Sequence, residues 1–179
     1  MIDTVILEKI KRFPVYQYHA IPVKKIPYDP AFRALCEENK CGYYNACHMC
    51  PPCVGEIADL HREMLGYRHA VVFSTEHILD DSFDLDGMLK ARIKHNRLAA
   101  DLRKEIRETQ KECDVLAAGG CGHCAVCALT EGLPCRAPGS AVSSMEAYGI
   151  AVNRLAEECE MEYIHPQGHL LYFGLILYS

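Results

Sequence analysis

Nine of the eleven cysteines lie in two short stretches of the 179-residue sequence. The later stretch reads GGCGHCAVCALTEGLPCRAP and contains a C-x2-C-x2-C run with a fourth thiol after a gap of seven residues: Cys121, Cys124, Cys127 and Cys135. Three cysteines spaced by two, with another further along, is how ferredoxin loops wrap a cubane iron–sulfur cluster. A zinc ion usually takes its thiolates from two separate C-x2-4-C pairs. The spacing favours a cubane, with zinc as the alternative.

The earlier stretch, CEENKCGYYNACHMCPPC, carries five thiols: Cys36, Cys41, Cys47, Cys50 and Cys53. The last three repeat the C-x2-C-x2-C spacing, and the first two are candidates for a more distant ligand. Five thiols are one more than a cubane needs, so the choice among them stays open. All nine cysteines of the two stretches are therefore candidate metal ligands, and the sequence predicts two 4Fe-4S clusters.

The composition restricts the compartment and the partners. Eleven cysteines is a high and odd number, which metal ligation explains better than a disulfide framework does. The N-terminus lacks the features of a signal peptide, and no apolar run is long enough to cross a bilayer. We therefore expect a cytoplasmic protein with no membrane partner. The formal net charge of −5 argues against a nucleic-acid partner.

Hydrophobic periodicity predicts the elements that position these loops. We expect strands over residues 15–26, 67–74, 113–118 and 169–178, and helices over residues 30–35, 54–66 and 85–112. A further helix is expected after Pro138, with Ser143 and Glu146 as a capping box and a turn over 166–168 before the last strand. The predicted class is α/β or α+β, a single domain over residues 1–179 with a small mixed sheet and two cysteine-rich loops.

The order of these elements has consequences for the sheet. The succession of strand, long helix and strand over residues 67–118 predicts a right-handed crossover and at least one parallel pair of strands. The later cysteine loop would then follow the carboxyl end of a strand, where α/β sheets place their sites. The apolar strand 169–178 is expected to close the sheet.

Several motifs together resemble a family of cysteine-rich predicted metal-binding proteins of unknown function, found mainly in anaerobic bacteria and archaea. The resemblance covers most of the chain. It depends on Cys36 and Cys41 with Tyr44, on Cys50-Pro51-Pro52, on the Cys121/Cys124/Cys127 loop with Pro134-Cys135-Arg136-x-Pro138, and on the segment SMEAYGI at 144–150. It implies binding of iron–sulfur or another metal in the cytosol. In the earlier loop it marks Cys36, Cys41 and Cys50 as ligands.

Other chemically active side chains have plainer explanations. Cys113 and Cys159 are predicted to be core residues, because one falls on a strand and the other on an apolar helix stripe. His48 and His123 lie inside the loops, where we expect hydrogen-bond donors or solvated side chains rather than ligands. Arg136 either binds an anion or cluster sulfide, or pairs with a surface carboxylate.

Three functions fit this sequence. The leading hypothesis is an iron–sulfur protein that passes electrons to a redox partner protein in anaerobic metabolism. The second is an enzyme in which one cluster has an open iron. The three thiols that the resemblance marks, Cys36, Cys41 and Cys50, would leave such a position exchangeable. The third is a zinc-stapled interaction domain.

Overall fold

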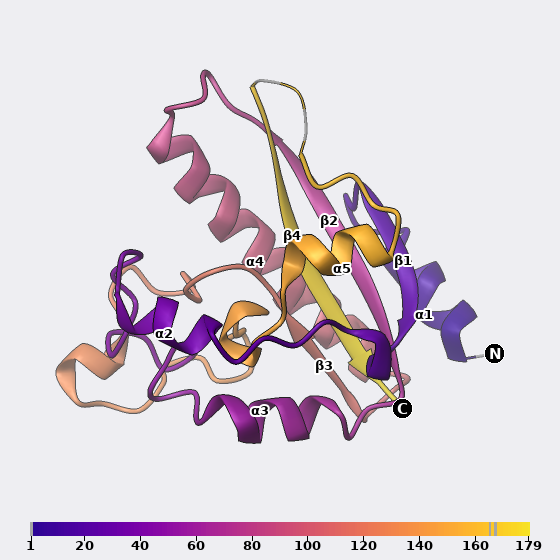
Figure 1. The fold of residues 1–179 in the computed structure, drawn as a ribbon, viewed down its shortest axis with the longest axis horizontal. Coiled ribbons are helices and arrows are strands. Elements are labelled where there is room, and N and C mark those ends of the chain that lie inside the picture. Colours follow the sequence, from indigo (N-terminus) through magenta and orange to yellow (C-terminus); the bar gives the residue numbers. More distant parts are fainter. Residues whose placement is uncertain (1, 165, 167) are drawn as a thin grey trace.

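The computed structural model describes residues 2–164, 166 and 168–179 (Figure 1). Its elements, with η for short 3-10 helices, are α1 (Ile2–Ile10), β1 (Gln17–Pro22), η1 (Val23–Lys25), α2 (Phe32–Glu37), α3 (Ile57–Met64), β2 (His69–Ile78), α4 (Leu85–Arg107), β3 (Cys113–Leu116), η2 (Ala128–Glu131), η3 (Glu146–Tyr148), α5 (Val152–Glu158) and β4 (His169–Tyr178). Each predicted strand is present. Helix α1 was not predicted from the sequence.

The described strands form one four-stranded sheet in the order β1-β2-β4-β3. All three ladders are antiparallel, so the predicted parallel pair is wrong. Strands β2 and β3 do run in the same direction, but β4 lies between them and pairs with both. The prediction that β4 closes the sheet is also wrong. Strand β4 is apolar on both faces, and a central position buries both of them.

Helices cover both faces of this sheet (Figure 1). One core contains residues of α3, η3 and α5 with the side chains of Val72 and Leu175, and the other contains residues of α1 and α4 with those of Val71 and Ile176. Successive strand residues alternate between the two cores because successive side chains of a strand point to opposite faces. The predicted class, α/β or α+β with a small sheet, is confirmed.

The segment after Pro138 differs from the single helix that its pattern predicted. Gly149 has a φ of +75°, and this left-handed residue separates η3 from α5. The predicted Ser143 cap is replaced by its neighbour, because the Ser144 hydroxyl accepts a hydrogen bond from the Ala147 N–H at 3.2 Å. The turn predicted at 166–168 lies partly outside the described residues.

Helix α4 presents an unexpected face to the protein interior. Leu85 and Leu89, the two leucines of its first turns, are both exposed. The buried face instead includes four polar residues among alanines, leucine and isoleucine: Arg92, His95, Asn96 and Arg103. These four side chains bind backbone groups of neighbouring segments, as described below. Among the described residues, no helix is both long and apolar enough to span a bilayer.

Candidate metal centre

The two cysteine loops meet at one end of the molecule, beyond β3 and next to α2 (Figure 1). The later loop leaves the sheet at the carboxyl end of β3, as the sequence predicted. Two hollows open among the thiols there. All eleven cysteines lie in the described residues, and all are free.

The first hollow, which we call hollow A, has a volume of about 210 Å³. Five thiols line it: Cys47, Cys121, Cys124, Cys127 and Cys135. Four of these belong to the later loop, as the spacing predicted. The fifth, Cys47, comes from the earlier loop, so the sequence run from Cys47 to Cys53 does not form one group in space.

The second hollow, hollow B, has a volume of about 220 Å³. Three thiols line it, Cys36, Cys41 and Cys50, which are the three that the family resemblance marked. Glu146, Tyr43 and Tyr44 also line it. Cys53 is exposed and lines neither hollow.

Cys47 and Cys50 join the two hollows. Both side chains are buried, and the Cys50 N–H donates to the Cys47 carbonyl oxygen at 3.0 Å. A hydrogen bond from the Cys50 thiol lowers the pKa of Cys47 to about 5, although burial acts in the opposite direction. Hydrogen bonds from the backbone of Cys121 and Met49 and from the Cys127 thiol lower this pKa further. The same thiol–thiol bond, together with burial, raises the pKa of Cys50. Cys47 is therefore readily converted to the thiolate that a metal requires.

Burial acts on other thiols of both hollows. It raises the pKa of Cys36, against the nearby Arg33, and it raises the pKa of Cys121, against hydrogen bonds from backbone groups. A bound cation would reverse this effect, because metal binding favours the deprotonated thiol. Among the described residues, no three Cys, His, Asp or Glu side chains converge closely enough to hold a single metal ion.

Tyr43 forms a wall shared by both hollows. Its ring packs directly on Gly120, where an added Cβ would come within 2.4 Å of the ring. The Arg92 guanidinium lies 4.6 Å from the ring centroid, and its Nη2 donates to the Tyr43 hydroxyl at 2.5 Å. Arg92 also donates to the Gly120 carbonyl oxygen at 3.0 Å. Helix α4 thus holds both the tyrosine and the glycine in place.

Asn96 holds the start of the later cysteine loop. Its Nδ2 donates to the carbonyl oxygens of Ala118 and Gly120 at 3.0 Å each and lies 3.3 Å from that of Cys121. Its Oδ1 accepts from the Ala118 N–H at 3.2 Å. A buried amide that bonds the backbone on both its donor and acceptor sides fixes the path of the chain into Cys121.

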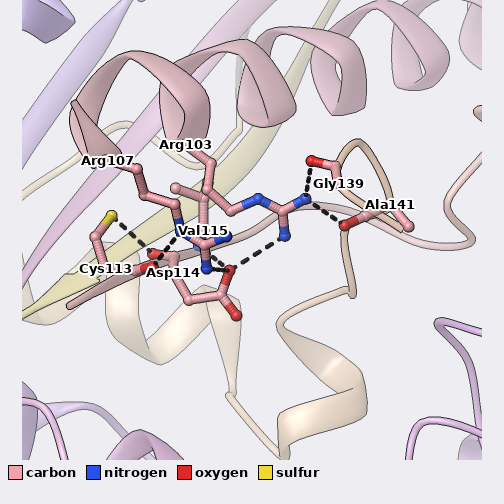
Figure 2. Close-up of polar contacts among 7 residues, drawn as sticks. All are labelled: Arg103, Arg107, Cys113, Asp114, Val115, Gly139 and Ala141. Atoms are coloured by element: carbon pink, nitrogen blue, oxygen red, sulfur yellow. Dashed lines mark hydrogen bonds and ion pairs between the residues drawn. The ribbon is translucent and has the colours of Figure 1, made fainter. Parts of the chain in front are cut away.

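Arg103 holds the other end of that loop (Figure 2). Its buried guanidinium donates to the carbonyl oxygens of Gly139 at 2.9 Å and Ala141 at 2.6 Å, and it pairs with Asp114 Oδ1 at 3.2 Å. Arg107 donates to the Cys113 carbonyl oxygen at 2.9 Å on the neighbouring turn. Side chains of helix α4 therefore hold both ends of the 119–138 segment.

The other residues that the sequence singled out form hydrogen bonds, an ion pair or core contacts. His48 Nε2 donates to the Leu133 carbonyl oxygen at 2.8 Å, which links the two cysteine loops. Arg136 pairs with the Glu131 carboxylate at 2.6 Å, so the surface ion pair is the alternative that the structure bears out. Cys113 and Cys159 are fully buried in the two cores, which confirms the prediction for both.

Glu146 is a site residue that the sequence reasoning missed. It belonged to a recognised motif, SMEAYGI, but the capping-box pattern assigned it to a helix start. In the structure it lines hollow B, and its Oε2 is buried without a hydrogen-bond partner. Burial raises the pKa of this carboxyl, against hydrogen bonds from the Ser144 hydroxyl and the backbone of Glu146 and Gly119.

Comparison with known proteins agrees with a metal centre. No curated protein and no solved structure matches the chain. The sequence model of one family, described as "Predicted metal-binding protein (DUF2284)", matches residues 19–178, which include both cysteine loops and Glu146. The chain therefore belongs to this family of predicted metal-binding proteins.

Proposed function

We propose that this protein is a cytosolic iron–sulfur protein with two centres that passes electrons to and from a partner protein. The observation that carries the proposal is the sorting of eight free thiols into two adjoining hollows of similar volume. Each hollow has room for far more than one water molecule. That room suits a polynuclear cluster better than a single ion.

The donor sets fit such groups. Hollow A offers the four thiols of the later loop and Cys47, which is enough for a cubane held entirely by cysteine. Hollow B offers three thiols, and a buried carboxylate oxygen without a partner. When bound, clusters of this kind accept and release single electrons, at potentials that the protein sets through hydrogen bonds, charge and solvent exposure.

The chain itself supplies that environment. The Tyr43 ring lies over Gly120 and separates hollow A from hollow B, so it limits the water that reaches either one. Cys47 and Cys50 are three residues apart and hydrogen-bonded, and each lines a different hollow. This contact provides a short covalent and hydrogen-bonded connection between the two centres.

Anaerobic purification followed by metal and sulfide analysis tests the proposal. We expect a brown protein with about eight iron and eight acid-labile sulfide, as two cubanes. EPR of the reduced protein should show two interacting centres, because the hollows adjoin. Stoichiometric zinc without sulfide would contradict the proposal and would favour the zinc-stapled interaction domain.

A second candidate function is an enzyme that binds substrate at an iron of hollow B. The observation that favours it is the count of three thiols there, compared with five in hollow A. An iron without a cysteine ligand is a Lewis acid with an exchangeable position. A change in the EPR signal of the hollow B centre on addition of a small molecule would support this function. Pure electron transfer predicts no such change.

A further inference from the structure

The carboxyl group of Glu146 is placed unusually for an acidic side chain. Glu146 lines hollow B together with Cys36, Cys41 and Cys50. Its Oε2 is buried and has no hydrogen-bond partner among the described residues.

No cation in the described part of the chain compensates this carboxylate. Arg92 is bound to the Gly120 carbonyl oxygen and the Tyr43 hydroxyl, and Arg33 donates to the Gly55 carbonyl oxygen at 2.7 Å. Neither arginine forms a salt bridge with Glu146. A buried carboxylate without a counterion is strongly destabilising unless it takes up a proton or binds a metal or another cation. Because three thiols share hollow B with this unpartnered oxygen, a metal ion is the partner that the lining favours.

The backbone around Glu146 is held rigidly. The Met145 N–H donates to the Ala117 carbonyl oxygen at 3.0 Å, and Ser144 forms a parallel bridge with Ala117 just beyond β3. Gly149, at the other end of η3, packs against the Tyr28 ring so closely that a Cβ would come within 2.6 Å of it. Metal ligands are usually held by such a rigid backbone, whereas mobile surface side chains are not.

We propose that Glu146 is the fourth protein ligand of the metal centre that Cys36, Cys41 and Cys50 hold. This inference rests on the proposed function and adds the ligand that the thiol count lacks. Carboxylate oxygen is a harder donor than thiolate sulfur, and iron–sulfur clusters are held by thiolates. The iron bound to Glu146 is therefore the exchangeable one. The centre in hollow B would then have one exchangeable iron, whereas cysteines alone would hold the centre in hollow A.

The test compares Glu146→Gln, Glu146→Cys and, as a matched control, Glu157→Gln, because Glu157 is exposed on α5. Each full-length protein is purified anaerobically and treated with ferricyanide. Oxidation of a cubane by one electron releases the labile iron as Fe²⁺ and leaves a three-iron cluster, whose appearance EPR follows. The centre in hollow A serves as an internal reference for correct folding.

We expect the wild-type protein and Glu157→Gln to form the three-iron signal at the same rate. Glu146→Gln should form it about tenfold faster, because a neutral amide holds iron more weakly. Glu146→Cys should resist conversion, because a fourth thiolate replaces the carboxylate. The Cys variant keeps the inference falsifiable even if Glu146→Gln folds poorly.

The possible results distinguish the role of Glu146 from the proposed function of the protein. If the wild-type protein contains no iron–sulfur cluster, the proposed function fails and the role of Glu146 fails with it. If both clusters are present and all variants convert at the wild-type rate, the proposed function stands and only the assignment of Glu146 is overturned. Conversion confined to hollow A would also overturn it.

Discussion

Cys47 and Cys50 are adjacent in space, linked by an N–H to carbonyl hydrogen bond of 3.0 Å, yet each lines a different hollow. The spacing of the sequence groups both with Cys53 as one ligand run. The turn instead directs Cys47 toward the later loop, whose Cys127 thiol hydrogen-bonds it. One turn of chain therefore contributes to both candidate centres and connects them.

This arrangement predicts which centre depends on Cys47. In Cys47→Ser, we expect iron to be lost from the centre in hollow A, because this thiol lines that hollow and its pKa is lowered to about 5. The three-iron signal of hollow B should still form. Iron and sulfide analysis with EPR of the anaerobic protein would measure both. Cys53→Ser, at an exposed thiol outside both hollows, is the control and should keep the wild-type iron content. Loss of the hollow B centre alone would show that the sequence spacing was the better guide.

The packing of Tyr43 on Gly120 predicts a strong effect of one added methyl group. Gly120→Ala places a Cβ within 2.4 Å of the ring, so the ring must move away from the wall between the hollows. We expect a loss of about 1–3 kcal/mol in the free energy of unfolding, typical of overpacking, and faster loss of iron in air. Urea titration and the decay of the visible absorbance measure the two effects. In Gly139→Ala the Cβ meets open space, so both values should stay near wild type. Equal behaviour of the two variants would argue against a packed wall.

The ion pair of Arg103 with Asp114 predicts that α4 holds the later loop in place (Figure 2). Arg103→Met removes the buried charge and leaves the carbonyl oxygens of Gly139 and Ala141 without their donor. We expect the free energy of unfolding to fall by about 3 kcal/mol, the range for breaking a buried pair. Urea unfolding followed by circular dichroism measures it. Arg97→Met, on an exposed face of the same helix, should change it by less than about 0.5 kcal/mol. A similar small change in both variants would mean that water replaces the guanidinium at little cost.

His95 predicts a specific dependence of stability on pH. The ring is fully buried, its Nε2 donates to the Phe173 carbonyl oxygen at 2.9 Å, and its Nδ1 accepts from the Thr75 hydroxyl at 2.7 Å. Burial lowers its pKa from 6.5 to about 3. The unfolded chain therefore binds a proton between these values that the folded protein does not. The contribution of His95 is complete above pH 6.5 and is lost progressively as the pH falls toward 3.

We expect the wild-type protein to lose about 2 kcal/mol more stability between pH 7 and pH 5 than His95→Gln loses. Urea unfolding of protein prepared without metal measures this difference at each pH. Other titrating groups, Cys47 among them, contribute equally to both proteins and cancel. His19→Gln, at an exposed residue of β1, should follow the wild-type curve. Parallel curves for wild type and His95→Gln would show that the buried ring is protonated without cost.

The sequence alone determined most of the local elements and indicated two cysteine loops as candidate metal sites. Period-two and helical patterns predicted all four strands and the long helix α4, since these patterns depend only on which side chains share a face. The thiol spacing identified the later loop, whose four cysteines do line one hollow. The apolar surroundings of Cys113 and Cys159 in the sequence were enough to place both in the core.

Only the tertiary structure decided what lies opposite each element. Strand β4 lies between β2 and β3, where both of its apolar faces are buried. Strand order depends on the packing of the whole domain, so local patterns do not specify it. The same limit applies to the site. Three features of the site depend on segments far apart in the chain. Cys47 lines hollow A, Asn96 binds the backbone of the later loop, and the Glu146 Oε2 is buried without a partner. Periodicity specifies the face that a residue occupies, and the folded chain determines the group that it meets there.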